Sequence, residues 1–238
     1  MSRAFADVVG AEVDKLRTLP IVVATALGTV GTAVTVAAAL VAAARRTGAA
    51  GVDGTATTLR TVAFLQVGTI LLGVVGAAVE YGGNQLRTTL VACPNRLLLL
   101  AGRAVAYLAV ATVTSGAALG AGLLVAGLGA GGSVRPDPGR LVGAAAYLVG
   151  IGLLGHVLAV LLRALVPALV AMLGLVLVVS PLLAGLTGYA RLLPDRAGQA
   201  LYAVPSPGLT APDGGLVLLG WIVAVGAAAA TTFRRLDA

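Results

Sequence analysis

Six long stretches without a charged side chain constrain the fold of this chain more than any motif does. They cover residues 21–44, 61–79, 104–134, 141–162, 164–190 and 214–233. About 20 apolar residues cross a bilayer as a helix, and these stretches lack the period-two alternation of membrane β-strands. The sequence therefore predicts an all-α membrane protein with six transmembrane helices, at about 21–44, 61–79, 97–129, 141–162, 166–187 and 214–233.

The composition excludes a water-soluble domain of this length. Hydrophobic residues make up 59% of the 238 residues, charged residues only 11%, and the mean hydropathy is +1.03. Soluble domains carry roughly 25% charge. The basic residues are scattered at span ends, where they meet lipid phosphates and water, so the net charge of +7 does not indicate nucleic-acid binding. Without a repeat or a second domain, residues 1–238 form one transmembrane domain.

Residues 4–17 show the periodicity of an amphipathic helix. Phe5, Val8, Val9, Val13 and Leu16 fall on one face, and the charged residues lie mostly away from it. This pattern predicts an interfacial helix with its apolar face toward the membrane. A solvated leader with chance periodicity is the alternative.

The connections between spans carry their own signals. The glycine- and threonine-rich stretch 45–60 predicts an irregular loop. Arg163 avoids lipid and Pro167 disfavours helix at Val166, so residues 163–167 predict a tight hairpin rather than one long kinked helix. With both termini in the cytoplasm, nine lysines and arginines lie inside and seven outside, a small margin in favour of that orientation.

The polar segment from Glu80 to Arg96 separates the second and third spans. Gly82-Gly83 breaks the incoming helix, Asn84 caps a new short helix, and Pro94 ends it. A short helix at a membrane face, between two spans, is suited to docking a soluble partner.

This segment resembles the connection between the second and third spans of ABC-2 type transporter permeases. The resemblance rests on Glu80, Arg87-Thr88-Thr89-Leu90, Pro94 and Arg96, followed by Leu97 to Leu100. It implies a cytoplasmic coupling helix between spans 2 and 3 that touches an ATPase. The implied coupling interface consists of Glu80, Gly82, Gly83, Asn84, Gln85, Arg87, Thr88 and Arg96.

The resemblance extends to both ends of the chain. ABC-2 permeases have an interfacial helix before span 1 and a short helix or re-entrant element before the last span. Residues 192–201 are similar to that element, although a plain surface loop over 187–213 is an alternative. Arg103 is a departure, because family members often carry a lysine near the start of span 3.

The family implies a function and a set of partners. The chain would be the permease subunit of an ATP-binding cassette exporter in a bacterial plasma membrane, with both termini cytoplasmic. Its partners would be an ATP-binding cassette subunit, a second permease copy or a related permease, and membrane lipids. The cargo would be an amphipathic drug, peptide or lipid-like molecule. The alternative is a membrane assembly factor or sensor subunit that uses no ATP.

The chain itself offers little catalytic chemistry. Lys15 is the only lysine and follows Asp14, so no phosphate-binding loop of the GxxxxGK[ST] type is present, and ATP and Mg²⁺ would belong to the partner. His156 is the only histidine and Cys93 the only cysteine, which excludes paired-histidine metal sites and an intrachain disulfide. We predict no catalytic, cofactor-binding or metal-binding residue and no enzyme activity. His156 is predicted to be structural, as a neutral imidazole hydrogen-bonded to a neighbouring helix, with a role in cargo or proton transfer as the alternative.

Overall fold

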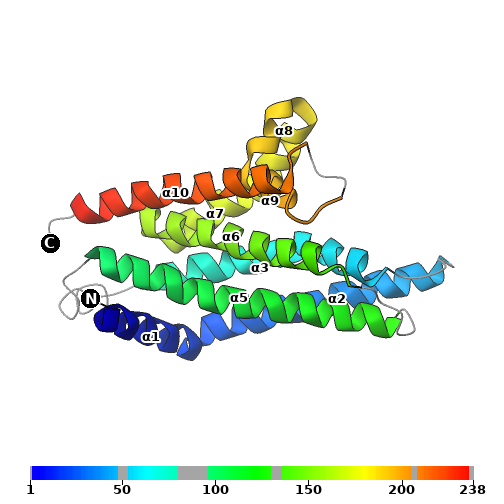
Figure 1. Cartoon of the computed structure of the whole chain (residues 1–238), viewed down its shortest axis with the longest axis horizontal. Coiled ribbons are helices and arrows are strands. Elements are labelled where there is room, and N and C mark those ends of the chain that lie inside the picture. Colours follow the sequence, from blue (N-terminus) through cyan, green and yellow to red (C-terminus); the bar gives the residue numbers. More distant parts are fainter. Residues whose placement is uncertain (1, 48–52, 80–95, 130–135, 205–207, 236–238) are drawn as a thin grey trace.

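The computed structural model describes residues 2–47, 53–79, 96–129, 136–204 and 208–235, which are helical and contain no β-strand. Figure 1 shows their arrangement. The long helices are α1 (Ser2–Thr18), α2 (Pro20–Arg46), α3 (Gly54–Ala78), α5 (Arg96–Gly129), α6 (Pro138–Leu162) and α10 (Ala211–Arg235). Between α6 and α10 lie α7 (Leu165–Gly174), the π-helix η2 (Leu175–Val179), α8 (Ser180–Leu186), the 3₁₀-helix η3 (Gly188–Leu192) and α9 (Pro194–Gln199).

Six of these helical stretches are long and apolar enough to cross a membrane: α2, α3, α5, α6, the continuous run 165–186 and α10. This confirms the prediction of six spans and gives the chain the architecture of a multi-pass membrane protein. In Figure 1 the N-terminus and the C-terminus lie at the same end of the bundle. We call this end the terminal end; α3 ends there and α5 begins there.

The second span begins seven residues earlier than predicted, at Gly54 instead of residue 61. The Asp53 carboxylate accepts a hydrogen bond of 3.1 Å from the N–H of Ala56 and so caps the helix. Thr58 and Thr61 are buried and donate their hydroxyls to carbonyls of their own helix. Because threonine satisfies its polar group in this way, the prediction of an irregular loop was wrong for residues 54–60.

The fourth and fifth spans are separated by Arg163 and Ala164 alone. Arg163 ends α6 in the left-handed conformation, with φ of 52°, and its Nη2 donates to the carbonyl of Thr232 at 3.4 Å. The predicted break is therefore present but shorter than predicted. Val166 and Pro167 lie in the first turn of α7, where the missing N–H of proline costs no helical hydrogen bond.

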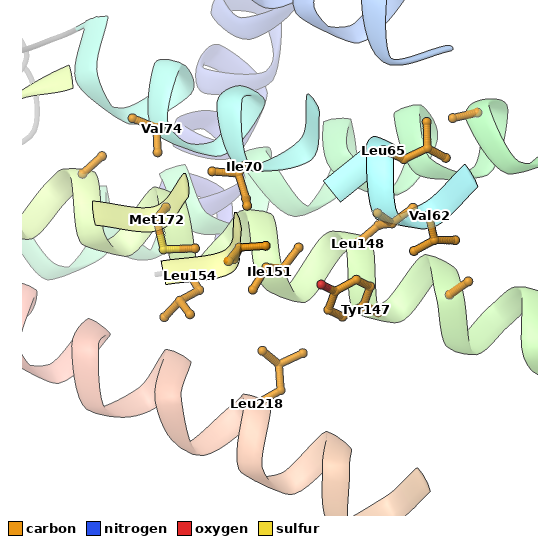
Figure 2. Packing of buried hydrophobic residues seen from close by; sticks show 14 of the residues in the cluster. Val62, Leu65, Ile70, Val74, Tyr147, Leu148, Ile151, Leu154, Met172 and Leu218 are labelled. Carbon is orange, nitrogen blue, oxygen red and sulfur yellow. The ribbon is translucent and has the colours of Figure 1, made fainter. Parts of the chain in front are cut away.

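The core forms where α3 packs on α6. Figure 2 shows Ile70 and Val74 of α3 among Ile151 and Leu154 of α6, with Met172 of α7 closing the cluster. Glycines allow the two backbones to touch: a Cβ on Gly73 would lie 2.0 Å from the carbonyl oxygen of Gly152. Helix α3 also contacts α2, α5 and α7, and it is the most buried of the spans.

The stretch before the last span is partly helical, as predicted. The short helix expected within 192–201 is α9. Before it, α8 stands away from the row of long helices in Figure 1. The preceding π-helix ends one residue before Ser180-Pro181, and the N–H of Ser180 bonds to the carbonyl of Leu175. Proline lacks an N–H and clashes with the preceding turn, which accounts for the wider backbone here.

Candidate functional site

The coupling residues inferred from the sequence lie almost entirely outside the described part of the chain. This holds for Glu80, Gly82, Gly83, Asn84, Gln85, Arg87 and Thr88, and for the side chain of Arg96. Their helical neighbours are described: α3 ends at Ala78 and α5 begins at Arg96, both at the terminal end of the bundle. The structure therefore gives the place where the segment is attached, and its interface remains a prediction.

Helix α1 is fastened to α5 by charge as well as by apolar packing. Arg103 is only 5% exposed, and its Nε lies 3.4 Å from Glu12 Oε1 in α1. Lys15 Nζ lies 3.5 Å from Glu12 Oε2 on the same helix. Burial lowers the pKa of Lys15, an effect that Glu12 opposes and Arg103 reinforces. No local pattern in the sequence indicates this pairing, because Glu12 and Arg103 are far apart along the chain.

Two close packing contacts also hold α1 against the spans. A Cβ on Gly102 would lie 2.6 Å from Val8 Cγ1, so α5 offers a glycine where α1 crosses it. Leu16 is buried, and it lies 3.4 Å from the Cβ position of Gly76 in α3. Helix α1 thus contacts both spans that flank the predicted coupling segment.

An open groove lies on the opposite side of α3 from its packing with α6. Its volume is about 680 Å³, and α2 and α3 form its walls. The lining residues are Ile21, Ala24, Thr25, Gly28, Thr29, Thr32, Ala63, Phe64, Val67, Gly68, Leu71 and Leu177, the last from η2. Phe64 and Leu177 are 56% and 50% exposed, so large apolar side chains face the open space. The volume is within the range of about 300–1,000 Å³ that small-molecule sites occupy.

The groove is apolar with hydroxyl groups at intervals, and none of its lining residues is ionisable. Thr25, Thr29 and Thr32 each donate their hydroxyl to the carbonyl four residues earlier, at 2.7–2.8 Å. Thr29 is buried against Gly68, whereas Thr25 and Thr32 are half-buried. Because the protons are used within α2, the hydroxyl oxygens of Thr25 and Thr32 are left to accept hydrogen bonds from a molecule in the groove. The groove suits an apolar molecule that carries N–H or O–H donors.

His156 lies in the α3–α6 contact, away from the groove. Its Nδ1 is 3.2 Å from the carbonyl oxygen of Gly73, and its ring stacks on Tyr107 with a centroid distance of 5.0 Å. The side chain is buried. This is the hydrogen bond to a neighbouring helix that the sequence predicted, and it favours the structural role.

A second polar cluster joins α8 to α9. Ser180 is fully buried and donates its hydroxyl to Asp195 Oδ2 at 2.5 Å, while Arg196 Nε donates to Ser180 Oγ at 3.2 Å. Asp195 is 2% exposed, and among the described residues no hydrogen-bond partner reaches its Oδ1. Burial raises the pKa of the Asp195 carboxyl, and the hydrogen bond from Ser180 offsets part of that effect. Neither the burial of Asp195 nor its hydrogen bond from Ser180 was predicted from the sequence.

No protein-family model matches this sequence, and no curated protein matches it significantly.

Proposed function

We propose that this chain is the permease subunit of an ATP-binding cassette exporter, and that the groove between α2 and α3 is part of its cargo pathway. The groove carries the proposal: it is large enough for a small molecule, open, and free of ionisable side chains along its lining. Amphipathic or lipid-like cargo fits this chemistry, because apolar walls accept the hydrocarbon part and the threonine oxygens accept hydrogen bonds.

The open side of the groove is best closed by a second copy of the chain. The two helices beside it, α2 and the run 165–186, are among the least buried of the spans. Gly28 borders the groove and Gly31 follows one turn later, and a Cβ on either would have no atom within 4 Å. Small residues on an open helix face permit close approach of another helix in a membrane. Two copies facing each other would enclose a pathway that one copy leaves open.

The energy source in this proposal is a separate ATP-binding subunit at the terminal end of the bundle. The support is the sequence of the segment 80–96 and its attachment between α3 and α5, two spans that α1 also contacts. ATP-driven movement of the segment would shift α3, which forms one wall of the groove. The population of groove conformations would then depend on nucleotide.

The decisive experiment is export by a defined complex. The tagged chain is purified from its native membrane with whatever ATP-binding cassette polypeptide accompanies it, and reconstituted into lipid vesicles. We expect vanadate-sensitive ATP hydrolysis by the complex and none by the chain expressed alone. ATP should also drive movement of an amphipathic fluorescent dye or a fluorescent phospholipid. Purification of the chain without any ATPase would favour the assembly-factor or sensor alternative.

Two charge reversals localise the coupling segment. Arg87→Glu should leave insertion intact but weaken ATPase binding or uncouple hydrolysis from export, because losing a desolvated charge contact costs about 2–5 kcal/mol. Arg60→Glu is the matched control: Arg60 is exposed near the start of α3, away from the terminal end. If Arg60→Glu impairs ATPase binding while Arg87→Glu does not, the proposed orientation is inverted.

Cross-linking tests the second copy. In a Cys93→Ser background, which removes the only cysteine, Gly28→Cys should form a dimer with a short bis-maleimide in membranes. Ala229→Cys, a buried position in α10, is the control and should not. A cross-linked product of unequal subunits would show a related permease in place of an identical copy.

A further inference from the structure

Residues 181–194 leave the bundle of long helices and return to it, and we call this stretch the excursion. Its two ends are joined by Ser180, Asp195 and Arg196, which we call the Ser180 cluster. The polypeptide leaves the bundle through α8, turns through η3 and returns at α9. The hydrogen bond between Ser180 Oγ and Asp195 Oδ2 joins the first residue of α8 to the second residue of α9. This hydrogen bond thereby holds the two ends of residues 181–194 together.

A second contact fastens the same loop to the last span. Trp221 Nε1 in α10 donates a hydrogen bond of 2.9 Å to the carbonyl of Leu192. The excursion is therefore held at its base by the Ser180 cluster and near its end by Trp221. Three large side chains in between, Leu182, Leu186 and Tyr189, gain little from packing, because they are 62%, 77% and 78% exposed.

The cluster also adjoins an irregular turn that reaches the groove. Ser180 follows the π-helix Leu175–Val179 directly, and Leu177 in that turn lines the groove between α2 and α3. Extra-wide turns of this kind are conformationally less regular than an α-helix and occur often at functional sites. A fixed Ser180 therefore fixes the end of the turn that presents Leu177.

We propose that Ser180 and Asp195 are positioning residues for the groove: their hydrogen bond holds the π turn and the excursion 181–194 in place, and so sets the position of Leu177. Asp195 suits this role because it is buried with one oxygen bonded and the other without a partner among the described residues. Loss of the one bond leaves a buried carboxylate without its closest donor, which is costly. That Leu177 contacts cargo rests on the proposed export function, whereas the hydrogen bond and its effect on the turn do not.

The tryptophan provides a readout that needs no transport. Trp221 is the only tryptophan in the chain, so the intrinsic fluorescence reports whether Leu192 remains bonded to it. In detergent or in vesicles, Ser180→Ala should increase quenching of this fluorescence by acrylamide and lower the melting temperature. The matched control is Ser115→Ala, which removes an equally buried hydroxyl that has no hydrogen-bond partner among the described residues. It should leave both quantities at the parent values.

Two further variants keep the test decisive. Asp195→Asn retains an oxygen that accepts from Ser180 and should keep the parent fluorescence, whereas Asp195→Leu should behave like Ser180→Ala. The double variant Ser180→Ala/Asp195→Leu should be no more destabilised than the worse single variant, since contacting partners are non-additive. Additive losses, or parent-like fluorescence in Ser180→Ala, would overturn the proposal.

Transport then tests the link to the groove. If the parent complex exports an amphipathic dye, Ser180→Ala should reduce the rate several-fold, and Ser115→Ala should not. Failure of the parent to export any probe would count against the proposed function and leave the fluorescence result standing. Export by Ser180→Ala at the parent rate, with altered fluorescence, would show that the cluster holds the excursion without setting the groove.

Discussion

The imidazole of His156 lies in the contact between α3 and α6, where glycines let the two helices approach closely. Gly73 and Gly155 bring the backbones of α3 and α6 together, and the ring then fits between the Gly73 carbonyl and the face of Tyr107. The sequence predicted a hydrogen bond to another helix because a lone polar group in an apolar span needs a partner. It did not identify the partner, since that depends on which glycine faces which helix.

A substitution at His156 separates the structural role from a role in transport. His156→Gln should retain the melting temperature in detergent, because an amide can donate a hydrogen bond to the Gly73 carbonyl. His156→Leu removes the bond and should lose about 1 kcal/mol, the usual worth of one such bond in a membrane protein. Export should survive in His156→Gln. Abolished transport in a normally stable Gln variant would instead assign His156 to cargo or proton transfer.

Asp195 predicts a pH dependence with a definite sign. Burial raises its pKa in the folded protein, so the folded state holds the proton at pH values where the unfolded state has lost it. Stability should therefore fall as the pH rises from near 4 through the folded pKa. Arg196 beside it, the buried Tyr147 and the half-buried Tyr202 are the titratable groups that interact with it.

The measurement is the difference between two melting curves recorded across that pH range. The parent should lose stability relative to Asp195→Asn as the pH rises, because asparagine does not ionise. The contributions of all other carboxyl groups to the pH dependence of stability are the same in both proteins and cancel in the comparison. A parent curve that runs parallel to that of Asp195→Asn would show that the carboxyl titrates alike in the folded and unfolded chain.

Among the elements, α3 and α6 form the least separable pair. Their contact is backbone against backbone: a Cβ on Gly152 would lie 2.6 Å from the Thr69 carbonyl oxygen and 2.0 Å from the Tyr107 hydroxyl. No rotamer relieves a clash with a carbonyl. The pair should therefore move as one body, so the groove changes when this body shifts relative to α2 and to the run 165–186.

Two leucine substitutions compare the tight α3–α6 contact with an open face of α5. Gly152→Leu should prevent recovery of a monodisperse protein, because overpacking of even a tolerant core costs about 1–3 kcal/mol and this site has no space at all. Gly120→Leu in α5 is the control, since a Cβ there meets nothing within 4 Å. Size-exclusion profiles of the two variants check the expectation. Equal recovery would mean that the α3–α6 contact is looser than the structure shows.

The sequence predicted the helical elements better than their contacts. Hydropathy located the six spans, and turn residues located the break at Arg163, since both depend on local composition. The start of α3 was misplaced because threonine is compatible with loop and helix alike. The pairing of Glu12 with Arg103 and the bond from Ser180 to Asp195 depend on the three-dimensional arrangement, which no local pattern contains.

At the scale of the whole molecule, an even number of spans places both termini on one side. Reporter fusions should read outside at Gly51 and inside at Ala238, according to the orientation inferred from the basic residues. Gly208 is the choice for the last outer connection, because it is exposed. Gly198 is unsuitable there, since a Cβ on it would lie 2.3 Å from the Tyr147 ring. A cytoplasmic signal at Gly51 would contradict this topology.

The two-residue connection between α6 and α7 constrains how the protein enters the membrane during synthesis. Arg163 and Ala164 together span no more than about 7 Å. The ribosome delivers α6 first. This helix cannot move far into lipid before α7 follows, because the connection between them is too short. We therefore expect the fourth and fifth spans to leave the translocation channel as a pair, with Arg163 at the membrane face between them.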